Sequence, residues 1–168
     1  MSAKPAAIHS IVFRETTIRI PIVNAGYLIA AKAGVFGGRK QFAEDRTTST
    51  VVGYARFDGP KAPLLEIALI PGELYPELSV GGIERYAGAD FPDAPVEPPI
   101  KPQMKAKYKM LFGLADDEIG YIIPKAEWDG KEPWLQNAPK RWYGESNSVG
   151  PEAAPIITAA FTELLRQP

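Results

Sequence analysis

The alternation of hydrophobic and polar positions predicts β-strands in the first half of the chain. Towards the end of residues 11–22 every second residue is isoleucine, with polar residues between, which is the period of a half-buried strand. Residues 48–57 are rich in threonine, valine and tyrosine and predict another strand. Residues 64–70 form an apolar run interrupted only by Glu66 and ended by Pro71, which is typical of a central strand.

The rest of the pattern predicts shorter elements and one good helix. Residues 27–31 are apolar and indicate either a buried strand or the start of a helix, residues 82–86 a single helical turn, and residues 108–114 a further strand. Residues 129–150 are typical of a loop. Residues 151–165 predict a C-terminal helix, because proline and glutamate suit its first turn. Three apolar residues are expected to share one face of this helix: Ile156, Ala160 and Leu164.

These elements predict an α+β or α/β fold with a mixed β-sheet and few helices, including the C-terminal one. The length of 168 residues suits a single domain over residues 1–168. Residues 89–103 contain five prolines, which exclude regular hydrogen-bonded structure. We expect this segment to be an exposed loop or a semi-rigid linker, inserted between two parts of one domain.

Composition and charge exclude several classes of protein. A net charge of -1 lacks the basic excess of a nucleic-acid binder. There is no cysteine, so neither a disulfide framework nor a thiolate zinc site is present. No apolar run reaches the ~20 residues of a transmembrane helix, and the N-terminus lacks the apolar core of a signal peptide. We therefore expect a soluble chain whose compartment the sequence leaves open.

Two acidic segments follow predicted strands and are candidates for chemistry. Glu73 follows residues 64–70, and ligands gather beyond the carboxyl ends of strands in mixed sheets. Such a carboxylate binds a metal or acts as a base, although a solvated loop glutamate has the same pattern. Asp116, Asp117 and Glu118 follow residues 108–114, where they either ligate a hard cation or form a charged turn.

Three short motifs occur in an order that is similar to a known family. They are Pro-Gly-Glu-Leu at 71–74, Gly-Leu-Ala-Asp-Asp-Glu-Ile-Gly-Tyr at 113–121, and Tyr-Gly-Glu-Ser-Asn-Ser-Val-Gly-Pro at 143–151, where the helix opens. Over residues 60–165 this order resembles the C-terminal part of the catalytic domain of neutral/alkaline non-lysosomal ceramidases. In that family the corresponding motifs carry asparagine in place of Asp116 and tyrosine in place of Glu118.

The resemblance implies a zinc-dependent amidohydrolase that cleaves N-acyl sphingoid or related lipid-like amides. Of the family's metal ligands, the glutamate falls on Glu73 and the tyrosine on Tyr121, and Asp116, Asp117 and Glu118 are expected to orient them. The family's two histidine ligands lie in an upstream half. The only histidine of this chain, His9, lies outside the motifs. The resemblance thus implies a fragment or derived domain that is catalytically incomplete alone, with zinc and an upstream half-domain as expected partners.

The alternative is a non-catalytic binding or assembly module that self-associates, because a half-domain exposes a sheet edge that a second copy can bury. A symmetric dimer that brings two copies of His9 to one site is a further option. A loop is bracketed by Trp128, Trp134 and Trp142. They form either a lipid- or ligand-facing rim or the packing of that loop onto the core.

Overall fold

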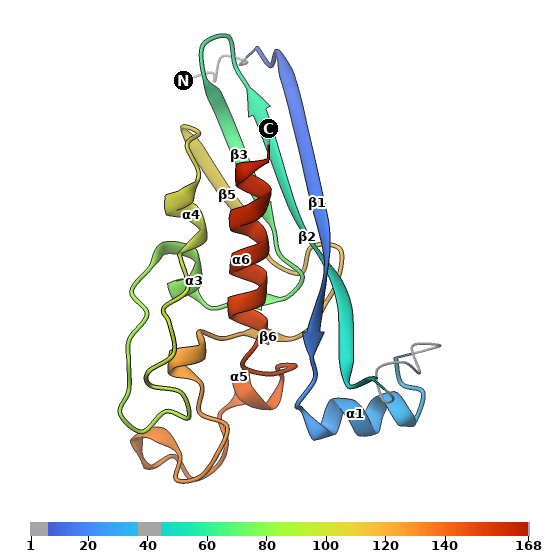
Figure 1. The fold of residues 1–168 in the computed structure, drawn as a ribbon, viewed down its shortest axis with the longest axis vertical. Coiled ribbons are helices and arrows are strands. Elements are labelled where there is room, and N and C mark those ends of the chain that lie inside the picture. The colour runs from blue at the N-terminus through green and yellow to red at the C-terminus, as the bar shows by residue number, and fades with distance from the viewer. Residues whose placement is uncertain (1–6, 37–44, 168) are drawn as a thin grey trace, which may run out of the picture.

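The computed structural model describes residues 7–36 and 45–167, and it confirms the mixed sheet and the C-terminal helix of an α+β fold (Figure 1). The strands are β1 (Ser10–Pro21), β2 (Thr47–Asp58), β3 (Pro63–Leu69), β4 (Glu73–Leu74), β5 (Tyr108–Phe112) and β6 (Tyr121–Ile122). The helices are α1 (Ala25–Lys32), α3 (Pro76–Val80), α4 (Ile100–Gln103), α5 (Tyr143–Ser146) and α6 (Ala153–Arg166), with 3-10 turns η1 (Lys125–Glu127) and η2 (Leu135–Asn137). In the described part of the chain, none of the helices combines the length and apolar character needed to cross a membrane.

The main sheet has the order β1-β2-β3-β5. Its first two pairs are antiparallel and β3 pairs with β5 in parallel. The prediction of a central strand is confirmed, since β3 lies between β2 and β5. Because β3 and β5 run the same way, their carboxyl ends meet at one edge of the sheet. The two acidic segments therefore leave the sheet side by side, and a second, two-stranded sheet of β4 and β6 forms there.

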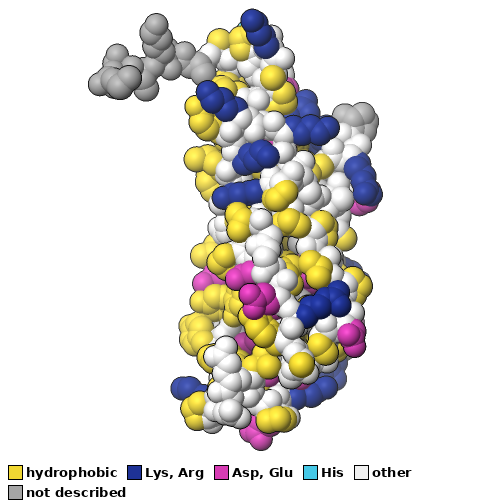
Figure 2. All heavy atoms as spheres, turned by 90° about the vertical axis from the view of Figure 1, so that its left-hand side faces the viewer, with side chains coloured by type: hydrophobic (Ala, Val, Ile, Leu, Met, Phe, Trp, Pro, Cys, Tyr) yellow, Lys and Arg dark blue, Asp and Glu magenta, His cyan; other side chains and the backbone are white. Residues whose placement is uncertain are grey.

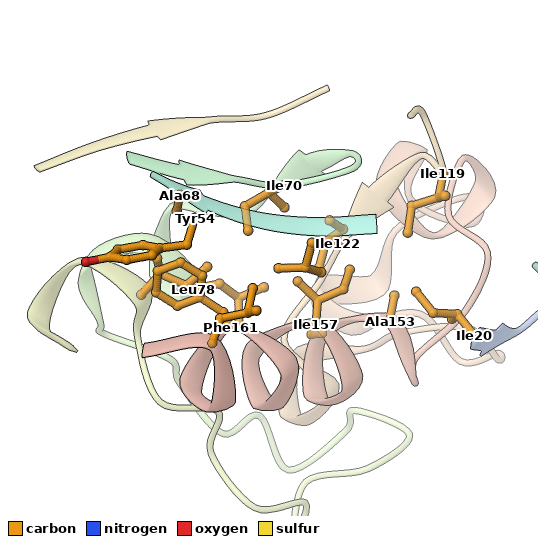
Figure 3. Packing of buried hydrophobic residues seen from close by; sticks show 14 of the residues in the cluster. Ile20, Tyr54, Ala68, Ile70, Leu78, Ile119, Ile122, Ala153, Ile157 and Phe161 are labelled. Carbon is orange, nitrogen blue, oxygen red and sulfur yellow. The ribbon is translucent and has the colours of Figure 1, made fainter. Parts of the chain in front are cut away.

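Helix α6 covers one face of the main sheet, and the core lies between them (Figure 3). The rings of Tyr54 and Phe161 meet edge to face with centroids 6.1 Å apart. The alternation expected for the first strand is confirmed, since Ile20 is fully buried under the helix. On α6 the buried stripe is centred on Ile157 and Phe161, and Leu164 belongs to it. The predicted partners of Leu164, Ile156 and Ala160, are only half-buried at its edge.

Glu66, the polar interruption of the central strand, is 4% exposed and has a structural role. Its carboxylate accepts a hydrogen bond from the hydroxyl of Tyr54 at 2.5 Å. It also accepts the backbone N–H groups of Lys105 and Ala106, each at 2.5 Å. Burial and this carboxylate raise the pKa of Tyr54, so its phenol stays a proton donor. Glu66 thus joins β2, β3 and the segment leading into β5.

The face of the main sheet opposite α6 is largely apolar, and Glu15 on β1 is its charged exception. Strand pairing aligns three rows of side chains on it, because paired residues point to the same side of a sheet. The rows are Ile11-Phe57-Leu65-Tyr108, Phe13-Ala55-Ile67-Met110 and Glu15-Gly53-Leu69-Phe112. We call these residues the open sheet face. Its side chains on the two outer strands remain exposed, with Phe13 56% and Met110 47% exposed.

Some short elements differ from the prediction. Of the two readings of residues 27–31, the helix is correct, since they lie in α1. Residues 82–86 are not helical, and the helical turn lies earlier, in α3. It ends at Gly81, whose φ of 96° is in the left-handed region, and Gly82 repeats that conformation with φ 101°. The expected loop of residues 129–150 contains α5.

The proline-rich segment 89–103 packs against the rest of the domain. The backbone N–H of Lys125 donates to the carboxylate of the buried Glu97 at 3.0 Å. The prediction that this segment lacks regular structure is wrong at its end, where residues 100–103 form α4. Pro102 is tolerated there because the N–H groups of a first helical turn have no partner within the helix. Ile100, fully buried, fixes this turn to the core.

Candidate functional site

Glu73 and Tyr121 lie directly opposite each other in the small parallel sheet of β4 and β6. The N–H of Glu73 donates to the carbonyl of Gly120 at 3.1 Å, and the N–H of Tyr75 donates to that of Ile122 at 3.0 Å. Two residues about fifty positions apart in the sequence are thus neighbours on one edge of the fold. We call Glu73 and Tyr121 the acid–phenol pair.

Two glycines permit this close approach of the strands. A Cβ atom on Gly72 would lie 2.5 Å from the carbonyl oxygen of Gly120. Gly120 itself has a φ of 86°, and a Cβ on it would lie 2.0 Å from the carbonyl oxygen of Asn147. Real Cβ atoms do not approach backbone so closely, so a side chain at either position would push the segments apart. Glycine before Glu73 and before Tyr121 is therefore a requirement of the pair's geometry.

The segment of the third motif completes this arrangement. The N–H of Tyr121 donates to the carbonyl of Asn147 at 2.9 Å, and Gly120 forms an isolated antiparallel bridge with Ser148. The buried side chain of Asn24 donates to the carbonyls of Ser146 and Ser148, both at 2.9 Å. The same side chain caps the start of α1. All three sequence motifs therefore lie side by side in the fold.

The phenol of Tyr121 lies close to the carboxylate of Glu73 and is set among other tyrosines. A hydrogen bond with Glu73 is the main cause that raises the pKa of Tyr121, followed by desolvation. The ring of Tyr121 meets those of Tyr75 and Tyr143 edge to face, with centroids 6.1 and 5.7 Å away. Because this pKa is raised, the phenol of Tyr121 is protonated at neutral pH in the absence of a cation. A cation bound by both oxygens would replace that proton.

Of the neighbouring acidic residues, the structure brings Glu118 towards the pair. Its carboxylate accepts the N–H of Gly120 at 2.6 Å, and its charge contributes to the raised pKa of Tyr121. Asp117 accepts the N–H of Glu118 at 2.9 Å. Asp116 is exposed at the turn with a φ of 66°, and its side chain takes no hydrogen bond or ion pair within the described residues. The carboxylates of Asp117 and Glu118 stabilise the turn that leads to Tyr121.

His9 lies at the far end of the sheet. His9 is exposed and immediately precedes Ser10, the first residue of β1. Ser10 pairs with Asp58 on β2, and Asp58 pairs in turn with Pro63, where β3 begins. Glu73 lies beyond the other end of β3, four residues after Leu69, so at least the length of that strand, roughly 20 Å, separates His9 from the pair. Within residues 7–36 and 45–167 no three His, Asp or Glu side chains are grouped so as to hold a metal ion. Within the described residues the acid–phenol pair is therefore not joined by further His, Asp or Glu side chains in a group able to hold a metal ion.

A pocket of about 480 Å³ opens beside the pair, and local sequence reasoning misses it. Its aromatic lining comprises Tyr75, Tyr86, Tyr121, Trp142 and Tyr143. Its acidic lining comprises Glu77, Glu127, Asp129 and Glu145. We call it the aromatic–acid pocket. Figure 2, which views the molecule from the side of α3 and α4, shows acidic side chains set among hydrophobic ones near the middle of that face.

The buried carboxylates of this pocket are held by specific contacts. Asp129 accepts the indole N–H of Trp142 at 2.7 Å and the backbone N–H of Leu135 at 2.8 Å. Glu145 accepts the backbone N–H of Asp129 at 3.4 Å. Burial raises the pKa of Glu145 and that of Glu127, because both carboxylates are partly removed from water. Of the three tryptophans, Trp128 is buried as loop packing while Trp142 lines the pocket.

Comparison of the chain with models of protein families, with curated proteins and with solved structures finds no match.

Proposed function

We propose that this chain is part of, or derived from, a zinc-dependent amidohydrolase resembling neutral ceramidase, and that it is catalytically incomplete alone. Glu73 and Tyr121 supply two of the zinc ligands, and another polypeptide segment supplies the two imidazoles. The substrate class is a linear, lipid-like amide such as an N-acyl sphingoid base.

One observation supports this proposal above the others. Glu73 and Tyr121, which the motifs select independently of any structure, are paired residues of adjacent strands. The turn holding Glu118 and the third motif surround the same point. Three short motifs placed at random along a chain of this length would not be expected to meet at one point of the fold.

The two oxygens fit part of a zinc site. A carboxylate and a phenolate are hard donors, and zinc accepts oxygen ligands beside imidazole nitrogens. When bound, the metal supplies Lewis acidity that activates water and polarises an amide carbonyl. The chain's own residues position the donors: Tyr75 and Tyr143 pack against the ring of Tyr121 and restrict its rotation. The carboxylate of Glu118 accepts the backbone N–H of Gly120, which immediately precedes Tyr121.

The open sheet face is consistent with a missing segment. A four-stranded sheet covered by a helix on one side and exposing apolar rows on the other lacks the second layer that buries such rows in complete domains. An upstream half-domain that packs on this face is the partner that the proposal requires.

Zinc content tests the proposal. Because the chain provides two ligands, we expect purified protein to keep less than one zinc per chain after dialysis against metal-free buffer. Added imidazole, which supplies nitrogen ligands, is expected to raise the content towards one. Glu73→Gln should abolish this rise, whereas Glu163→Gln, which alters an exposed glutamate on α6, should not. Elemental analysis measures the content, and equal zinc in the Glu73→Gln variant would contradict the assignment.

The second candidate function is that of a non-catalytic assembly module, and the open sheet face favours it specifically. Five side chains of this face are about half exposed or more: Ile11, Phe13, Tyr108, Met110 and Phe112. Together they expose roughly 500–600 Å², at the upper limit of the largest apolar patch of a typical monomer. With the half-buried inner rows, the area approaches the ~800 Å² that each partner buries in a stable interface. The partner proposed here is a second copy of the chain.

A further inference from the structure

We infer that the aromatic–acid pocket binds an organic cation, in particular a quaternary or primary ammonium group. This site does not require zinc and goes beyond the proposed hydrolase activity. It rests on the lining of the pocket, on buried carboxylate oxygens without partners, and on a volume that suits a small molecule.

The residues that line the pocket indicate the chemical class of its ligand. Five aromatic rings and four carboxylates line the pocket, and none of the described lysines or arginines does. Aromatic faces attract cations through their quadrupoles, and this attraction is strongest for tryptophan and tyrosine. Carboxylates add direct charge complementarity. A volume of about 480 Å³ falls in the range of small-molecule sites and exceeds what a bare metal ion needs.

Two buried carboxylates provide a second, independent observation that points to a bound cation. Asp129 is 1% exposed and Glu145 4% exposed, and each keeps one carboxylate oxygen without a hydrogen-bond partner among the described residues. Glu77, which belongs to α3, also has one such oxygen. Buried acceptors of this kind are costly unless a donor or a cation satisfies them.

The basic side chains nearby do not provide partners for these carboxylate oxygens. Burial raises the pKa of Glu145, and the charge of Arg141 offsets this only in part. Arg141 forms no ion pair within the described residues, and its own Nε is buried without a partner. Lys125 is paired with Glu152 at 2.5 Å. Four carboxylates against one nearby guanidinium leave the pocket acidic.

Choline and its neutral isostere 3,3-dimethyl-1-butanol form a matched pair of probes, because they share size and shape and differ in charge. Binding is measured by isothermal titration calorimetry on the full chain. Choline is expected to bind with millimolar affinity or better and at least about tenfold more tightly than the neutral alcohol, since charge recognition supplies the difference.

Variants locate the site. Glu77→Gln and Glu127→Gln keep the shape of two half-buried side chains and remove one charge each, so each is expected to weaken choline binding about threefold to tenfold. Glu163→Gln removes an equal charge outside the pocket and should leave the affinity unchanged. Trp142→Leu tests the aromatic wall and is expected to weaken binding about fivefold.

Three results would overturn the inference: no heat of binding for choline at high millimolar concentration, equal affinity for the two probes, or choline binding that all pocket variants leave unaffected. Circular dichroism of each variant checks that the fold persists. Glu127→Gln and Glu77→Gln alter different elements, η1 and α3, so loss of folding in one leaves the other as the test.

Discussion

Replacing Glu66 by alanine is expected to lower the free energy of unfolding by about 3–4 kcal/mol, because three hydrogen bonds to one buried carboxylate are lost together. The hydroxyl of Tyr54 and the N–H groups of Lys105 and Ala106 would remain without their acceptor. Such a loss exceeds the effect of removing a single neutral hydrogen bond because the orphaned groups stay inside the fold. Urea denaturation followed by circular dichroism measures the difference.

Two neighbouring variants serve as controls. Tyr54→Phe removes one donor and is expected to cost about 1 kcal/mol. Glu66→Gln retains an acceptor oxygen and should fall between the two. A Glu66→Ala variant no less stable than Tyr54→Phe would mean that water or a rearranged backbone satisfies these groups, and that Glu66 does not join the strands as described.

The second large effect is expected on self-association. The alternative function predicts that the chain dimerises at micromolar concentration through the open sheet face, with the sheets packed face to face. Phe13→Lys combined with Met110→Lys places two positive charges in the middle row of that face. In a symmetric interface each charge occurs twice, so we expect the dissociation constant to rise by about a hundredfold or more. Sedimentation velocity over a range of concentrations measures it.

The matched control adds the same charge elsewhere. Ile29 on α1 and Val80 on α3 are 67% and 61% exposed and lie outside the open sheet face. The double variant Ile29→Lys with Val80→Lys should associate like the original chain. A chain that is monomeric at high micromolar concentration would reject the assembly module and leave the face for another segment. A dimer that survives the Phe13 and Met110 changes would place the contact elsewhere.

The strands were predictable because their hydrophobic period is local. Every second residue from Ile18 to Ile22 is isoleucine, and the structure buries Ile20 and Ile22. Helix α6 was predictable for the same reason, although its buried stripe is centred on Ile157 and Phe161 rather than on the predicted residues. Glu66 shows the limit of pattern reading, since an apolar run with one charge does not reveal where that carboxylate finds its donors.

The candidate site was only partly predictable. The motifs select Glu73 and Tyr121, but their pairing depends on the parallel register of β3 with β5, which no local pattern encodes. The aromatic–acid pocket was missed because its walls come from segments more than sixty residues apart, from Tyr75 to Glu145. Each of those residues has an ordinary neighbourhood in the sequence. Only folding places their carboxylates and rings around one volume.

The most direct test of the acid–phenol pair as a metal site is the ionisation of Tyr121. Because Glu73 raises its pKa, the phenol is protonated at mildly alkaline pH without metal. If zinc binds both oxygens, zinc with imidazole should produce the ultraviolet difference spectrum of one tyrosinate per chain. Tyr121→Phe should abolish that signal, and Tyr86→Phe, which removes another tyrosine of the pocket, should retain it. The same zinc-dependent signal in Tyr121→Phe, or none in the original chain, would contradict the account.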